Sequence, residues 1–205
     1  MLLCDIGNTS YHFLHGKRRY KKSCVDFDPS TISQKVYYIC VNPKISKKLN
    51  KLPNWINLAK FVKIKKYYKT MGIDRVFACE AIHNGVIVDA GSAITVDVVR
   101  DGQFEGGFIL PGLQAMKHAY TEVSTALDYR FNFGIDFLTL PRNSQDAISY
   151  AYLKVLYTEV SAQNLEIFLT GGDAGKLKKV FPNAEKKGKL LFKGMKKIIK
   201  KVGLE

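Results

Sequence analysis

The 205-residue sequence has no long uninterrupted apolar run, although 46% of its residues are hydrophobic and can form a core. The best candidate for a membrane span, Val86 to Val99, is broken by Asp89 and Asp97, and a span needs roughly 18 apolar residues. The N-terminal stretch has no basic segment followed by an apolar one, so we expect no signal peptide. These absences predict a cytoplasmic protein that does not bind membranes.

Cysteine is also scarce. Cys4, Cys24, Cys40 and Cys79 lie far apart and form no C-x-x-C pair. This spacing argues against both a disulfide framework and a zinc ribbon. The four histidines show no H-x-x-x-H spacing either. We therefore expect buried cytoplasmic thiols and no zinc site.

Acidic residues are few, at 18 against 32 lysines and arginines, which gives a formal net charge of +14. Such a positive charge is typical of proteins that bind nucleic acid, and it would also attract an anionic substrate. The basic residues are mostly lysines in scattered clusters, however. In "GMKKIIKKVG" the residues Met195, Ile198, Ile199 and Val202 recur at helical spacing, which leaves the lysines facing solvent. We expect a solvated basic surface and no nucleic-acid partner.

A strand followed by a polar turn occurs twice in the chain. "MLLCDIGNTS" and "GVIVDAGS" are both apolar strands that end on an aspartate, with glycine and a hydroxyl side chain soon after. Each is followed by further strands, "YHFLHG" and "RRYKKSCVDF" in the first case and "AITVDVVRDGQFEGGFILPG" in the second, where Asp101-Gly102 predicts a tight turn. The repetition predicts an internal duplication that divides the chain near Thr70.

The second half has a stronger helical pattern. Apolar residues at intervals of three and four predict helices over Leu113–Leu127 and Gln145–Val160. "LEIFLTGGDAGKLKKVF" predicts a buried strand, a glycine turn and a helix, and a closing strand and helix follow. We therefore predict an α/β fold with two lobes, residues 1–70 and 71–205, and a cleft between them.

The two aspartates suggest what the repeated turns are for. Carboxylates that face one cleft repel each other unless cations lie between them, and nucleotide-bound Mg²⁺ can supply that charge. Glycine beside each aspartate allows phosphate to approach backbone N–H groups. Asp, Gly and Asn are also common turn formers with no ligand. Two copies after matching strands favour the phosphate site.

The motifs "DIGNT", "GIDR", "DAGSAIT", "GGFILPG" and "LTGGDA", in this order, resemble the type III pantothenate kinases. The resemblance spans nearly the whole chain and is strongest from Gly72 to Gly112. It implies two ribonuclease-H-like lobes, as in sugar kinases, acetate kinase and actin. It also implies ATP-dependent phosphorylation of pantothenate to 4′-phosphopantothenate, the first step toward coenzyme A, by a homodimer that uses Mg²⁺ and a monovalent cation, K⁺ or NH₄⁺.

Carried over position by position, the resemblance makes Asp74 the general base and Asp89 the ligand of the monovalent cation. Asp5 reaches Mg²⁺ through phosphate. The implied ATP-binding residues are Asp5, Ile6, Gly7, Asn8, Thr9, Ser10, Tyr11, His12 and Ser92. The implied pantothenate-binding residues are Tyr68, Gly72, Ile73, Asp74, Arg75 and Ser144.

Three positions depart from the family pattern. His12 stands where many relatives have lysine, and Ser92 and Ser144 replace the commoner threonines. The histidine would remove one positive phosphate contact, whereas the serines keep the hydroxyl. We expect these departures to change nucleotide affinity more than the reaction.

The residues leave several alternatives open. Asp74 could simply cap a helix or pair with Arg75, and Gly171-Gly172 could be the adenosine-side turn or only a bend. Asp97 is not assigned to the site. The carboxylates and the basic charge would also suit a ribonuclease-H-like nuclease, and a third hypothesis is a non-catalytic regulator.

Overall fold

The computed structural model describes residues 1–204, which form two compact units. The first unit comprises Met1–Ile82 together with the C-terminal segment from Leu190, and the second comprises His83–Lys189. Each unit contains one five-stranded sheet. The cleft expected between the lobes stays a prediction.

The sheet of the first unit has the order β3-β2-β1-β4-β5. Its strands are β1 (Leu2–Ile6), β2 (Ser10–His15), β3 (Arg18–Ser23), β4 (Val36–Cys40) and β5 (Trp55–Asn57). The first three strands are antiparallel, whereas β4 runs parallel to β1 and β5 runs parallel to β4.

The second sheet repeats this arrangement, with the order β8-β7-β6-β9-β10 when it is read from its antiparallel edge. Its strands are β6 (Gly85–Ala90), β7 (Ala93–Arg100), β8 (Gln103–Pro111), β9 (Ile167–Thr170) and β10 (Glu185–Lys186). Again the first three strands are antiparallel and the last two are parallel to the first. The predicted duplication is confirmed, and the fold is that of two ribonuclease-H-like lobes.

Helices complete both units. The α-helices are α1 (Pro43–Leu49), α2 (Ile73–Glu80), α3 (Leu113–Val123), α4 (Ser144–Ser161), α5 (Ala174–Leu177) and α6 (Leu190–Lys201). The short 3₁₀ helices are η1 (Pro29–Thr31), η2 (Leu58–Phe61), η3 (Ile64–Lys66) and η4 (Thr125–Leu127). The closing strand expected at the start of "KLLFKGMKKIIKKVG" is not found there, because α6 begins at Leu190 and the short strand β10 lies before this segment.

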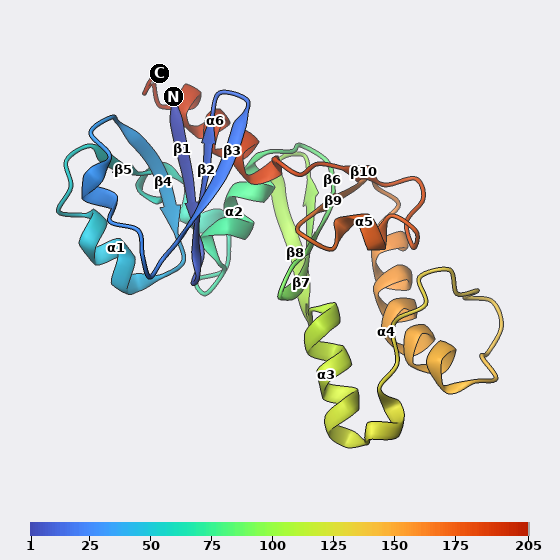
Figure 1. The fold of residues 1–205 in the computed structure, drawn as a ribbon. Helices are drawn as coiled ribbons and strands as arrows, with labels where there is room; N and C mark the ends of the chain where they lie inside the picture. The colour runs from blue at the N-terminus through green and yellow to red at the C-terminus, as the bar shows by residue number, and fades with distance from the viewer. Residues whose placement is uncertain (205) are drawn as a thin grey trace. The chain divides into compact units, whose positions relative to one another are not determined.

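The C-terminal helix changes the expected domain boundary. Its apolar stripe, which includes Met195 and Ile199, joins the core formed by Leu3 of β1 and Phe77 of α2. Burying this stripe removes apolar surface from water, so α6 belongs to the first unit and not to a lobe spanning 71–205. Figure 1 shows the C-terminal end of the chain, in red, beside the blue N-terminal strand.

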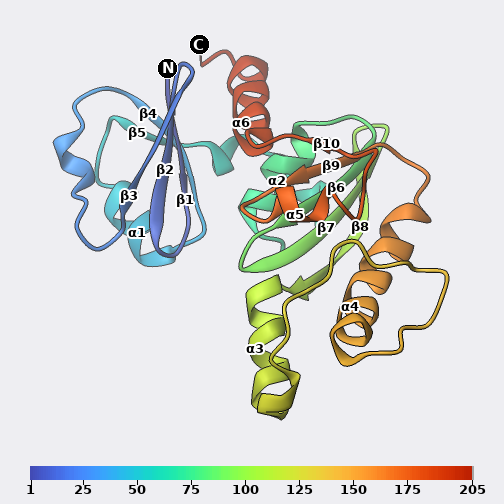
Figure 2. The same cartoon turned by 45° about the vertical axis from the view of Figure 1, so that its right-hand side comes forward.

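In the second unit, helices cover one face of the sheet. Val86, Val88 and Ala90 of β6 share a buried core with Leu153 and Leu156 of α4. In Figure 2, α3 and α4 extend from the same side of this sheet. The residues of β6 between these core positions, including Asp89, therefore lie on the opposite face.

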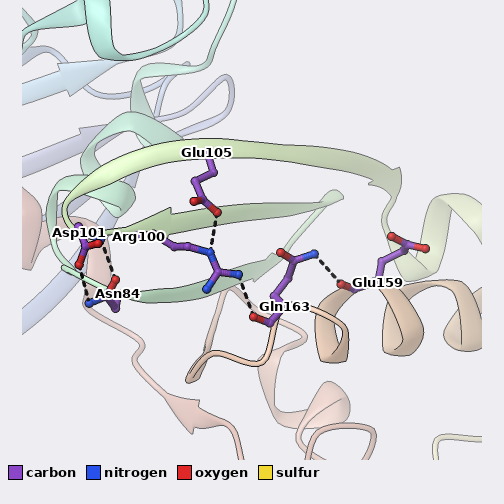
Figure 3. Close-up of polar contacts among 6 residues, drawn as sticks. All are labelled: Asn84, Arg100, Asp101, Glu105, Glu159 and Gln163. Atoms are coloured by element: carbon purple, nitrogen blue, oxygen red, sulfur yellow. Dashed lines mark hydrogen bonds and ion pairs between the residues drawn. The ribbon is translucent and has the colours of Figure 1, made fainter.

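A polar network ties the β7–β8 hairpin to its neighbours (Figure 3). Arg100 Nε donates to Glu105 Oε2 at 2.7 Å, and Arg100 Nη2 donates to the carbonyl of Gln163 at 2.9 Å. Asp101 N donates to Asn84 Oδ1 at 2.7 Å. Asp101 and Gly102 have φ values of 49° and 70°, as a tight primed hairpin turn requires. The prediction that Asp101 is a hairpin-turn residue is confirmed.

The cysteines form no disulfide: Cys4 and Cys79 are buried, and Cys24 and Cys40 are half-buried. Burial raises the pKa of the Cys4 thiol well above its ordinary value, so this thiol stays protonated. Within residues 1–204, none of the helices is both long enough and apolar enough to cross a bilayer.

Candidate functional site

The first polar turn connects β1 to β2 in the first unit. Asp5 is half-buried near the end of β1, and Gly7 N donates to Ser10 O at 3.0 Å to close the turn. Asn8 and Thr9 are exposed at its tip. The turn therefore presents an amide, a hydroxyl and backbone groups outside the sheet, as a phosphate site needs.

Strand β3 supports this turn from the edge of the sheet. Cys24 N, just past β3, donates to Thr9 O at 2.9 Å, and Cys24 Sγ lies 3.8 Å from Gly7 O. Because β3 is hydrogen-bonded to the turn, its side chains are held at a fixed distance from the turn.

The glycines of the two turns are not needed by the fold. Neither Gly7 nor Gly91 has a positive φ. An added Cβ would lie 3.8 Å from Ser10 O at Gly7 and 3.7 Å from Ala93 O at Gly91, both ordinary van der Waals distances. Neither conformation nor packing therefore requires glycine at these positions, and the missing side chain leaves room for a ligand to approach the backbone.

We expect Gly7→Ala to leave stability almost unchanged and to weaken ATP binding, because the new methyl group occupies space that a phosphate would use. The measurements are thermal unfolding and the dissociation constant of Mg-ATP. Gly134→Ala is the control for adding a methyl group at a loop glycine, since Gly134 has no positive φ and its added Cβ would lie 3.6 Å from Asn132 Oδ1, also an ordinary contact. Unchanged ATP binding in Gly7→Ala would contradict the phosphate role of this turn.

Helix α2 carries the second group of candidate residues in the first unit. Asp74 lies in the first turn of α2, and its Oδ1 accepts a hydrogen bond from Arg75 N at 2.9 Å. A Cβ at the N-cap residue Gly72 would lie 2.5 Å from Asp74 Oδ1, so glycine is required there for the carboxylate to fold back over the helix start. The capping alternative is thus correct for one oxygen of Asp74, which leaves the second oxygen for a substrate.

Arg75 lies beside Tyr68. Arg75 is only 7% exposed, its Nη1 donates to Tyr68 Oη at 2.5 Å, and its guanidinium lies 5.7 Å from the centre of the Tyr68 ring. A buried guanidinium held by an aromatic ring is preorganised to bind a carboxylate. Tyr68 therefore lies at the start of α2 beside Arg75, close to Gly72, Ile73 and Asp74. The role of these residues in binding pantothenate stays a prediction.

His12 lies on β2 and pairs in register with Asp5. The pKa of His12 is lowered from its ordinary value of 6.5, first by desolvation and then by the positive charges of Lys21 and Arg19. The imidazole is therefore neutral at pH 7 and supplies no positive charge there.

The second polar turn has the same construction. Asp89 is half-buried near the end of β6, Gly91 N donates to Ala93 O at 2.9 Å, and Ser92 is exposed. The "LTGGDA" segment lies against this turn, because Asp173 N donates to Ala90 O at 2.9 Å. Gly171 has φ of 86° and leaves no room for a Cβ beside Asp89 Oδ1. Its adenosine role stays a prediction.

The surroundings of Asp89 fit a monovalent cation. Asp89 pairs in register with Thr95 on one side and with Thr170 on the other, so all three side chains share one face. Thr95 Oγ1 is buried and has no hydrogen-bond partner among the described residues. An orphaned hydroxyl costs about 1–3 kcal/mol, which a cation held by the carboxylate and the hydroxyl would offset. The sequence did not identify Thr95.

The same residues do not form a dedicated site for Mg²⁺. Among the described residues, no group of three or more His, Cys, Asp or Glu side chains could hold a metal ion. Mg²⁺ commonly keeps several waters and binds one or two carboxylates plus phosphate oxygens.

Two further polar residues lie in the second unit: Ser144, which the sequence assigns to pantothenate binding, and Asp97, which it leaves unassigned. Ser144 is exposed at the start of α4, next to the N-cap Asn143, whose side chain accepts from Asp146 N at 2.9 Å. Its contact with pantothenate stays a prediction. Asp97 of β7 is 1% exposed and lies on the same sheet face as Asp89.

Comparison with known proteins completes this picture. The family model described as type III pantothenate kinase matches residues 40–163. A type III pantothenate kinase of Sulfurimonas denitrificans is 54% identical over 204 residues, covering 100% of both chains. One of Helicobacter hepaticus is 39% identical over 204 residues, covering 98% of this chain and 99% of that relative. A crystal structure from Campylobacter jejuni, described as a conserved putative Baf family transcriptional activator, is 36% identical, with a TM-score of 0.87 and 100% coverage of both chains. The chain belongs to the type III pantothenate kinase family.

Proposed function

We propose that this protein transfers the γ-phosphoryl group of ATP to the primary alcohol of pantothenate, the first step toward coenzyme A. One observation carries the proposal: at the start of α2, Asp74 keeps an oxygen available beside the buried, Tyr68-bound Arg75. This pairs a proton acceptor with a fixed cation, which suits a substrate that has both an alcohol and a carboxylate. The full-length match to type III pantothenate kinases supports the same substrate.

Each group of site residues has one of the roles that phosphoryl transfer requires. Phosphoryl transfer passes through a loose transition state, so positioning and charge neutralisation dominate catalysis. The turn after Asp5 and the turn after Asp89 each present N–H groups to phosphate, and Ser92 adds a hydroxyl in the second turn. Arg75 binds the pantothenate carboxylate, and Asp74 accepts the proton of the attacking alcohol. Mg²⁺ bound with ATP supplies positive charge to the phosphates.

The decisive assay compares acceptors. Purified protein is incubated with Mg-ATP and K⁺ and with pantothenate, a sugar or acetate, and ADP release is measured. Rapid ADP release with pantothenate alone, together with 4′-phosphopantothenate detected by mass spectrometry, is the expected result. Turnover of a sugar or acetate in place of pantothenate would reject the proposal.

Activity is expected to require K⁺ or NH₄⁺, and Thr95→Val is expected to raise the K⁺ concentration needed for half-maximal rate. The substitution keeps the shape of the side chain and removes the orphaned hydroxyl beside Asp89. The measurement is the rate as a function of K⁺ at constant ionic strength. Thr121→Val is the control, because its hydroxyl already bonds to Lys117 O on α3. An equal K⁺ requirement in both variants would remove Thr95 from the cation site.

We also place the enzyme in the cytoplasm and expect a homodimer. The second unit exposes several large apolar side chains that a second copy could cover: Ile109, Val123, Leu138 and Leu140. Light scattering on the purified protein tests this expectation, and a monomeric mass at micromolar concentration would contradict it.

The alternatives receive less support. A metal-dependent nuclease needs clustered ligands, and the part of the chain that the structure describes holds no such group. The Campylobacter jejuni relative is described as a putative transcriptional activator. Here Asp5, Asp74 and Asp89 are all present, as a working kinase requires and a regulator does not.

A further inference from the structure

Three residues form one row across the antiparallel strands of the first unit. Asp5 of β1 pairs with His12 of β2, and His12 pairs with Lys21 of β3. Directly paired residues in antiparallel strands project from the same face of the sheet. Lys21 therefore lies on the face of Asp5, two strands away, or about 10 Å between backbones.

Arg19 belongs to the same face. It pairs with Leu14, which lies two residues after His12. His12, Arg19 and Lys21 line a cavity of about 320 Å³, which Phe192 of α6 helps to enclose. The cationic side chains of Arg19 and Lys21 therefore lie at the same cavity as His12, which pairs with Asp5. Phe192 of α6 gives this cavity an apolar wall.

The strand that carries these cations is fixed to the phosphate turn. The hydrogen bond from Cys24 N to Thr9 O, at 2.9 Å, joins the end of β3 to the tip of the turn. Lys21 is three residues from this anchor. Movement of the turn would therefore move the backbone of Lys21 with it.

Charge in the first unit favours an anion at this position. This unit holds about two thirds of the basic residues of the chain and only one third of the acidic ones. His12, in the centre of the row, carries no charge at pH 7, so the positive charge beside the turn comes from β3.

We propose that Lys21 and Arg19 bind the triphosphate at the first turn and supply the cationic contact that His12 does not. The inference rests on the proposed kinase function and deepens it by naming two residues of β3 as the cations that contact the phosphates. Lys21 lies in the row of Asp5 and is the main contact. Arg19, two pairs further from the turn, contributes the weaker one.

The test is binding of Mg-ATP and of adenosine to Lys21→Met, measured by calorimetry. Lys22→Met is the matched control, because Lys22 pairs with Tyr11 and lies on the opposite face of the same strand. We expect Lys21→Met to weaken Mg-ATP binding by about tenfold, the loss typical of one charge-assisted hydrogen bond. Adenosine, which has no phosphate, should bind both variants equally, and Arg19→Gln should show a smaller loss for Mg-ATP.

The possible outcomes are distinct. Equal Mg-ATP affinity in Lys21→Met and Lys22→Met, with pantothenate turnover intact in the wild type, overturns this inference and leaves the kinase proposal standing. Weakened adenosine binding in Lys21→Met also overturns it, because the loss would then not be one of phosphate contacts. If wild-type protein neither binds Mg-ATP nor phosphorylates pantothenate, both proposals fail. A difference between the two lysines that shrinks at high salt supports the charge contact.

Discussion

Asp74→Asn is expected to reduce turnover of pantothenate by roughly 10²–10⁴-fold, the usual contribution of a general base. The amide oxygen of asparagine can still accept the hydrogen bond that Asp74 Oδ1 receives from Arg75 N. The start of α2 should therefore keep its structure, whereas the alcohol of pantothenate loses its proton acceptor. The measurements are kcat and KM for pantothenate, with circular dichroism to verify the fold.

The comparison that isolates this role is Asp74→Asn against Glu80→Gln. Glu80 lies at the other end of the same helix and accepts from Tyr67 Oη at 3.1 Å, so its substitution also removes one carboxylate charge from α2. Glu80→Gln should retain most of its activity. If Asp74→Asn keeps wild-type kcat, Asp74 acts only as a capping residue and the general base lies elsewhere.

Gly194→Ala is expected to destabilise the first unit by about 3 kcal/mol, at the upper end of the effect of overpacking a core. Gly194 lies on α6, and an added Cβ would come closer to the backbone oxygen of Phe77 than the 3.0 Å that real Cβ atoms keep. Since backbone atoms cannot rotate away as a side chain can, α6 must move from α2. The expected readout is a fall of several degrees in the midpoint of thermal unfolding.

Gly175→Ala provides the matched control for this substitution. It also replaces a helical glycine, and its added Cβ would meet only the flexible end of Lys186, at 3.6 Å. This variant should unfold within about a degree of wild type, because surface substitutions rarely change stability by more than about 0.5 kcal/mol. Equal melting points for the two variants would mean that α2 and α6 are not closely packed.

Sequence periodicity predicts most of the fold. Alternating or continuous apolar runs identify the strands of both sheets, and the repeated aspartate turn reveals the duplication that the shared strand order confirms. The region between residues 54 and 69 is less predictable. The structure has a three-residue strand there, followed by two 3₁₀ helices. The apolar residues of this lysine-rich region do not recur at helical spacing along its whole length. They therefore form no continuous apolar face that could be packed to stabilise a full helix.

The site residues also divide into those that local sequence motifs predict and those that they do not. Short motifs are enough to place Asp5 and Asp89 near the ends of strands and Asp74 at the start of a helix. Aspartate and glycine favour such positions because of their own conformational preferences, which can be predicted from neighbouring residues alone. Lys21 and Thr95 cannot be found by local reasoning. Their positions beside Asp5 and Asp89 depend on strand register, which is set by long-range pairing and turn geometry. The same holds for α6, whose apolar stripe indicates a buried face and not which sheet covers it.

The return of α6 to the first unit sets an order for folding during synthesis. Domains generally fold as units, with N-terminal ones first, as the ribosome releases them. Here the second unit is continuous from His83 to Lys189, whereas the first receives its last helix only from Leu190 onward. The earlier strands therefore leave the ribosome with Leu3, Leu14 and Phe77 still lacking the helix that buries them. Nascent chains of this enzyme thus expose an apolar face until translation is nearly complete, which makes the N-terminal sheet the expected client of ribosome-bound chaperones.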